Sequence, residues 1–199
     1  GEVFPAVRGI AGSEKVRVML DGHLVNSPRT GSAFHVFDDF PVENIKRIEI
    51  IRGPGSAVYG ENAFSAVINI ITFDAKDIDG IRISGGYGSF DTEEGNIVFG
   101  KTCGKVDISG MVHYRHTDGF DGIVESDIVT RIDNNLPTPP FPDASQAPGR
   151  VEDWREEYDL NLKVAYKGFY VEGLYINKNK GLFTSPLFAL NDESNFELN

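Results

Sequence analysis

The sequence predicts an α+β first part followed by an antiparallel β meander. Three observations lead to this fold class. Residues 45–73 read as a strand, a glycine turn, a brief helical stretch and a second strand. From residue 80 onward, apolar and polar residues alternate in segments of about ten residues. The links between these segments alternate between short and long. We therefore expect a first domain over residues 1–75, a linker over 76–79, and strands with their loops over 80–199.

The stretch 45–73 organises the first domain. Its first strand runs through the apolar residues 48–51 and ends at Arg52, and the turn Gly53-Pro54-Gly55 follows. A second irregular piece covers residues 59–63. Residues 65–73 are then β-branched or apolar at most positions, with Asn69 as the polar exception. This composition predicts a buried strand.

Shorter elements precede that stretch. Residues 16–20 alternate in character and predict a strand, which the turn Asp21-Gly22 closes. Residues 26–32 are polar and contain Pro28 and Gly31, so we expect a loop there. The pattern at 38–43 predicts the start of a short helix, because capping acids come first, a proline falls in the first turn and another acid follows.

The second half reads as a set of half-buried strands. Alternation is clearest at 81–87, 106–114 and 158–166, and weaker at 96–101 and 169–176. Aromatic residues lie near the strand ends, as in the girdles of outer-membrane barrels; they are Tyr87, Phe90, Tyr114, Tyr158, Tyr166 and Phe169, with Trp154 just outside. A soluble antiparallel sandwich shows the same alternation and stays an alternative.

The two alternatives differ in what surrounds the apolar strand residues. In a membrane barrel these residues face lipid, and buried charges on the other face indicate the lumen; in a soluble protein they pack in a core. The residues concerned are Ile81, Val106, Ile108, Leu160 and Leu162. The links favour the barrel, because tight turns at 103–105 and 166–168 alternate with longer links at 89–94, 117–153 and 178–195. The proline-rich segment 137–142 predicts an irregular or disordered surface segment.

Composition excludes some classes of function. The net charge of -11 argues against a nucleic-acid partner, although a soluble acidic protein has the same charge. The single cysteine, Cys103, allows no internal disulfide. No apolar run reaches the roughly 18 residues of a transmembrane helix, which leaves barrel strands possible. Because the chain begins without Met and ends on the strand-like residues 196–199, we expect a fragment of a longer precursor.

No catalytic centre, metal site or cofactor emerges from the motifs. His113 and His116 are three apart on a predicted strand and point to opposite faces. His23 and His35 have no cysteine or carboxylate at ligand spacing. The glycines at 55 and 60 have the spacing of a phosphate-binding loop, but residues 61–62 replace the required lysine and hydroxyl. We therefore expect no enzyme.

Three motifs together resemble the plug domain of TonB-dependent outer-membrane receptors. They are Arg-Gly-Pro at 52–54, Tyr-Gly at 59–60 and Val-Ile-Asn-Ile-Ile-Thr at 67–72, in the order and spacing of that family. The resemblance extends to Arg8-Gly9 and to the Leu-Asp-Gly hairpin at 20–22, so it covers nearly all of residues 6–73. It implies a small mixed sheet with short helices, followed by the first strands of a barrel of the 22-stranded type.

The resemblance also implies roles for individual residues. Arg8 and Arg52 would pair with glutamates on the inner barrel wall and lock the plug in place. Plug loops that face outward would contact the ligand; carried over by position, they contain Gly12, Ser13, Glu14, Pro28, Arg29, Thr30, Ser32, Glu61 and Asn62.

The function implied is transport across the bacterial outer membrane. Such a receptor captures an iron–siderophore, haem or cobalamin and imports it with energy delivered through TonB. The partners are then a small metal-chelate ligand, outer-membrane lipid and TonB, which would bind an N-terminal segment that this chain lacks. Two alternatives stay open: a receptor-like colicin or adhesin target, and a soluble all-β ligand-binding or adhesion module without transport.

Overall fold

The computed structural model of the protein describes residues 5–7, 9–34, 40–53, 55–60, 62–135, 145 and 147–181. The chain divides into two compact units. One combines residues 1–82 with 98–111 and 161–173, and the other combines 83–97 with 112–160 and 174–199. The division at residues 75 and 80 stays a prediction, because these units do not follow chain order. Among the described residues, no helix has the length and hydropathy needed to cross a membrane.

A four-stranded mixed sheet forms the centre of the first part, with the strand order β4-β3-β6-β5. β3 (Val16–Leu20) pairs in parallel with β6 (Ala66–Thr72). β4 (His23–Leu24) and β5 (Ile45–Arg52) add antiparallel strands on either side. The two central strands have a neighbour on each side and supply most of the apolar core. Both predicted central strands, and the turn at Asp21-Gly22, are therefore confirmed.

The outer strand β5 differs from β6 although both look apolar in sequence. Its isoleucines Ile48, Ile50 and Ile51 are exposed among the described residues. β5 pairs only with β6 in this sheet, so its other edge and much of its surface are uncovered.

Short helical turns connect these strands. η1 (Ser13–Lys15), η2 (Val42–Asn44), α1 (Ser56–Tyr59) and α2 (Ala75–Ile78) each span about one turn, and β1 (Ala6–Val7) with β2 (Ile10–Ala11) forms a small hairpin. The predicted short helix near residue 40 is present as η2, which begins after Pro41. The expected caps Asp38 and Asp39, and the turn residue Pro54, lie outside the described residues.

Most of the expected linker 76–79 lies in the helical turn α2 (Ala75–Ile78). Asp74 caps the backbone of Asp77, and the carboxylate of Asp77 caps the backbone of Asp74. Such a capping box satisfies two N–H groups that a helix start leaves without partners. The Lys46 ammonium on β5 also lies 2.7 Å from Asp77, and its hydrogen bond is the main cause that lowers the pKa of that carboxyl. The linker is thereby fixed to the sheet.

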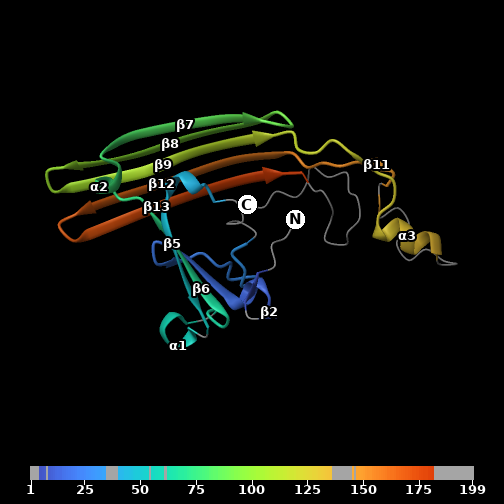
Figure 1. Ribbon diagram of the computed structural model, residues 1–199, viewed down its shortest axis with the longest axis horizontal. Helices are drawn as coiled ribbons and strands as arrows, with labels where there is room; N and C mark the ends of the chain where they lie inside the picture. Colours follow the sequence, from blue (N-terminus) through green and yellow to red (C-terminus); the bar gives the residue numbers. More distant parts are fainter. Residues whose placement is uncertain are drawn as a thin grey trace. The chain divides into compact units, whose positions relative to one another are not determined.

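The second half forms a five-stranded meander in the order β13-β12-β9-β8-β7. The strands are β7 (Gly80–Gly88), β8 (Thr92–Cys103), β9 (Val106–Thr117), β12 (Arg155–Tyr166) and β13 (Phe169–Lys180). Figure 1 shows these long strands side by side. All five predicted strands are present, including the two weak ones, and two-residue turns follow β8 and β12 as predicted.

Two of the longer links differ from the prediction. The link at 89–94 is a three-residue turn over 89–91, because β8 already begins at Thr92. The link at 117–153 contains the strands β10 (Ile123–Val124) and β11 (Gly149–Arg150), which pair with each other, and the helix α3 (Ile128–Asn135). The proline-rich segment 137–142 and most of the third long link lie outside the described residues.

The two faces of the meander decide between the alternatives for its apolar residues. Ile81 is 70% exposed, Leu160 and Leu162 are also exposed, and Val106 and Ile108 are partly exposed. The other face of β12 carries polar side chains that are buried, namely Glu157, Asp159, Asn161 and Lys163. An apolar face that is open to the surroundings, backed by buried charges, is the pattern of a barrel wall rather than of a soluble core. The soluble alternative therefore has no support here.

Candidate ligand-binding surface

Three loops of the first unit carry the residues expected to contact a ligand. The first contains Gly12 and runs into η1. The second is the turn region 27–32 after β4, and the third follows α1 and contains Asn62. They are far apart in sequence: residue 62 is 48 positions from residue 14 and 31 from residue 31. Whether they can act together depends on contacts across the loops.

Asn62 joins the three loops through its side-chain amide. Its Nδ2 donates to the carbonyl of Glu14 at 2.8 Å and to the carbonyl of Gly31 at 3.0 Å. The backbone of Asn62 is left-handed, with φ 63°, a conformation that asparagine tolerates better than most residues. Gly31 also has a positive φ, and a Cβ there would lie 2.9 Å from the Asn62 amide nitrogen. The close approach of these two loops therefore depends on asparagine at position 62 and glycine at position 31.

Asn26 fixes the second loop to the sheet. Its side chain is buried; Oδ1 accepts from the Val18 N–H at 2.7 Å, and Nδ2 donates to the carbonyls of Val16 and Gly31 at 2.9 and 2.7 Å. Gly31 also donates to the Ser27 carbonyl at 2.8 Å. Sequence reasoning missed Asn26, and an isolated polar residue at the start of a loop gives no signal by which to find it.

The predicted contact residues differ in how accessible they are. Glu14, Pro28, Arg29 and Thr30 are exposed, and Gly12, Ser13 and Asn62 are partly exposed. Ser32 is only 4% exposed.

The Ser32 hydroxyl accepts from the Phe34 N–H at 3.1 Å, so it stabilises the turn and does not face outward. Glu61 lies outside the described residues. Among the predicted contact residues that the structure describes, the accessible groups include the carboxylate of Glu14, the guanidinium of Arg29 and the hydroxyl of Thr30, which suits hydrogen bonding to a polar ligand.

The two arginines expected to lock the plug cannot both be assessed. Arg8 lies outside the described residues, and Arg52 is exposed at the end of β5. Their pairing with barrel glutamates stays a prediction.

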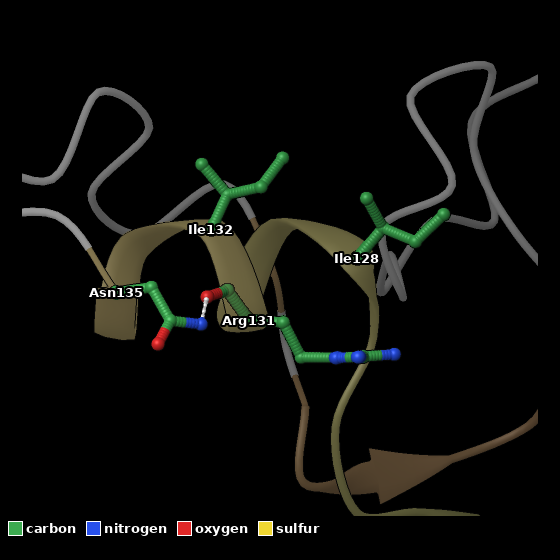
Figure 2. Close-up of a pocket in the computed structure, with 4 residues that line it drawn as sticks. All are labelled: Ile128, Arg131, Ile132 and Asn135. Carbon is green, nitrogen blue, oxygen red and sulfur yellow. Dashed lines mark hydrogen bonds between the residues drawn. The ribbon is translucent and has the colours of Figure 1, made fainter.

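A second candidate surface lies in the loop between β9 and β12. The helix α3 lines a pocket of about 520 Å³ with Ile128, Arg131, Ile132 and Asn135. Figure 2 shows the two isoleucines projecting from the same side of the helix, and Asn135 Nδ2 donating to the Arg131 carbonyl. Asp127 caps the helix by accepting from the Thr130 N–H at 2.8 Å. This capping residue and the apolar residues at helical spacing are the sequence signals that could have located α3.

The inner face of the meander is polar and contains one of the histidines. His113 Nδ1 donates to Asn96 Oδ1 at 2.7 Å, and its Nε2 lies 3.9 Å from Asp159 Oδ2. His116 is partly exposed and lies 3.2 Å from Asp118. The two histidines have different partners and surroundings, as their spacing predicts. Among the described residues, no three potential metal ligands come together.

The comparisons with known proteins agree with this geometry. The family model described as TonB-dependent Receptor Plug Domain matches residues 1–67, the part that forms the mixed sheet and its loops. This match over residues 1–67 agrees with the plug-domain resemblance that the sequence motifs predict.

The chain is also similar to a curated protein and to several solved structures. The vitamin B12 transporter BtuB of Vibrio vulnificus is 35% identical over 118 residues, which is 58% of this chain and 18% of that protein. The pyoverdine outer membrane receptor FpvA of Pseudomonas aeruginosa matches with a TM-score of 0.58 at 13% identity, over 88% of this chain and 22% of that one.

The siderophore receptor PiuA of Acinetobacter baumannii matches with a TM-score of 0.57 at 13% identity, over 88% of this chain and 20% of that one. The chain therefore spans about a fifth of the length of these relatives. The structural matches show the fold, a plug followed by barrel strands. These relatives are described as a vitamin B12 transporter, a pyoverdine outer membrane receptor and a siderophore receptor.

Proposed function

We propose that the chain is part of a receptor that imports a scarce ligand across the outer membrane. The observation that carries this proposal is the set of three plug loops joined by Asn62, on a domain that precedes strands with an apolar outer face and a polar inner face. The exposed loop residues would bind the ligand. This proposed function requires no covalent chemistry at the site.

The complete protein would contain a closed barrel of the 22-stranded type around the plug. Five strands cannot close, and the outer strands β7 and β13 each have one unpaired edge in the described sheet. The rest of the barrel would cover these edges, which supports the view that this chain is a fragment. TonB would supply the energy through a segment outside this chain.

Cobalamin is the first ligand class to test, because the relative with 35% identity is a vitamin B12 transporter. Ferric siderophores and haem are the competing classes, since receptors for siderophores share the fold. In each case the metal arrives within the cargo, so the receptor needs no resident cofactor. The exposed Glu14 and Arg29 provide hydrogen-bonding groups of both signs for such a polar chelate.

The test uses the full-length receptor in cells that lack their own uptake system for the ligand. Import of labelled cyanocobalamin, a ferric siderophore or haem is measured with and without an uncoupler. The proposal expects one ligand to bind under both conditions and to enter only in energised cells. Outer-membrane extracts are also run with and without boiling. A band of fixed mobility, or a failure of all three ligands to bind, would overturn the proposal.

A further inference from the structure

Lys163 on β12 is a buried cation whose acidic partners come from the plug. Its side chain is 5% exposed, and its Nζ lies 2.7 Å from Asp21 Oδ2. The second carboxylate near it is Asp74, at 3.8 Å. Asp21 belongs to the turn between β3 and β4, and Asp74 precedes α2. All three residues are in the same compact unit.

Asp21 is held in place by contacts within the plug that do not involve the lysine. Its Oδ1 accepts from the Thr72 N–H at 3.0 Å, and its Oδ2 accepts from the Thr72 hydroxyl at 2.6 Å. Thr72 is fully buried at the end of β6. The turn is fixed further by the Asp21 N–H, which donates to the Ile70 carbonyl at 2.8 Å. The carboxylate therefore has a set position and needs little ordering when it binds Lys163.

A neighbouring contact follows the same pattern. Asn44, the last residue of η2, donates through Nδ2 to Asn161 Oδ1 on β12 at 3.4 Å, and Asn161 Nδ2 donates to Glu172 at 2.9 Å. Asn44 and Asn161 are both 1% exposed. Two successive inward residues of β12, Asn161 and Lys163, thus each contact a different loop of the plug.

We propose that Lys163 and Asp21 form a latch that fastens the plug to the barrel wall, separate from the expected arginine locks. The polarity is the reverse of those locks, because here the plug supplies the acid and the wall supplies the base. The proposal rests on the receptor architecture proposed above. When the plug docks, Asp21 pairs with the charge of Lys163, so the wall strand recognises this part of the plug by charge complementarity.

The two partners contribute unequally when one is removed. Among the described residues, Asp21→Asn leaves the buried Lys163 ammonium with only the more distant Asp74, and an uncompensated buried charge is costly. Lys163→Met leaves Asp21 with both hydrogen bonds from Thr72, so the carboxylate keeps partners. The acid variant should therefore loosen the plug more than the lysine variant.

The experiment measures plug retention in the full-length receptor. The purified protein is placed in a planar bilayer, and its ionic conductance is recorded as urea rises; the urea concentration at which the barrel begins to conduct reports release of the plug. We expect D21N to lower this midpoint most and K163M to lower it less. The double variant D21N/K163M should lie above D21N, because the uncompensated charge is gone.

The matched control is E49Q, which breaks the exposed Arg47–Glu49 pair on β5. This variant should leave the midpoint unchanged. A K163M midpoint equal to that of E49Q, together with a double variant no better than D21N, would overturn the latch. If D21N does not fold, the test is the urea midpoint of K163M compared with that of E49Q, and equal midpoints would overturn the latch. A wild-type protein without heat-modifiable mobility would instead refute the receptor architecture.

Discussion

Asn62→Gly should loosen the three plug loops without straining their backbone. Glycine accepts the positive φ of this position at no steric cost, so the variant removes mainly the two hydrogen bonds to Glu14 and Gly31. A hydrogen bond contributes about 0.5–1.5 kcal/mol net, so the loss of two corresponds to about 1–3 kcal/mol. Local opening of the loops should then become roughly 5- to 150-fold more frequent.

Hydrogen exchange on the full-length receptor measures this change. The amides to follow are Ser27 and Gly31, whose hydrogen bonds at 2.9 and 2.8 Å close the second loop. Asn62→Ala should exchange faster still, since a left-handed alanine adds about 1–2 kcal/mol. Amides of the buried β6 serve as the internal control. Unchanged exchange at residues 27 and 31 in Asn62→Gly would refute the idea that this amide holds the loops together.

Three further predictions follow from other contacts. Gly100→Ala should destabilise the receptor by about 1–3 kcal/mol in thermal unfolding, because a Cβ there would lie 3.0 Å from the Ala75 backbone; wild-type stability would show that α2 can move aside. Burial alone would raise the pKa of Asp21, but hydrogen bonds from Lys163 and Thr72 outweigh it and hold that pKa below its ordinary 3.8. The latch should therefore be intact above about pH 4 and be lost as pH falls through the depressed pKa. In Lys163→Met the pKa of Asp21 should be higher than in the wild type, so acid-induced release of the plug should begin at a higher pH; conductance against pH checks this, and identical acid profiles would contradict it. Leu160→Arg should cost about 2–4 kcal/mol in a bilayer if its exposed face meets lipid, whereas Ile123→Arg in the outer loop should have little effect; equal tolerance of both in unfolding from vesicles would argue against a lipid-facing wall.

Sequence reasoning located elements whose residues carry a local signal. β6 was predictable because its β-branched run has a single polar exception, and the meander strands because their alternation matches a two-sided wall. The exposure of β5 was not predictable, since its isoleucines resemble those of β6 and only the strand order separates an edge from a centre. The wrong length of the link at 89–94 has a similar cause, because Thr92 and Glu93 are polar but continue a strand.

The sequence indicates individual residues for the candidate site, whose role as ligand contacts stays a prediction, but it does not indicate how they are arranged. The resemblance to plug domains indicated Glu14 and Asn62 by position. It could not show that the Asn62 amide contacts the backbone of both other loops, because those contacts join residues far apart in the chain. Ser32 was wrongly expected to face outward, since burial of a small hydroxyl depends on packing that no local pattern records.

The parallel pairing of β3 with β6 has a consequence for how the plug forms. The hydrogen bond from Thr72 to Asp21 closes a loop of 51 residues, which by chain statistics alone costs about 3.5 kcal/mol in entropy. Until that closure, the uncharged, β-branched segment Ala66–Thr72 has no partner on its β3 side. Segments of this composition aggregate readily when exposed. The newly made chain should therefore depend on chaperones that shield this segment until β3 pairs with it.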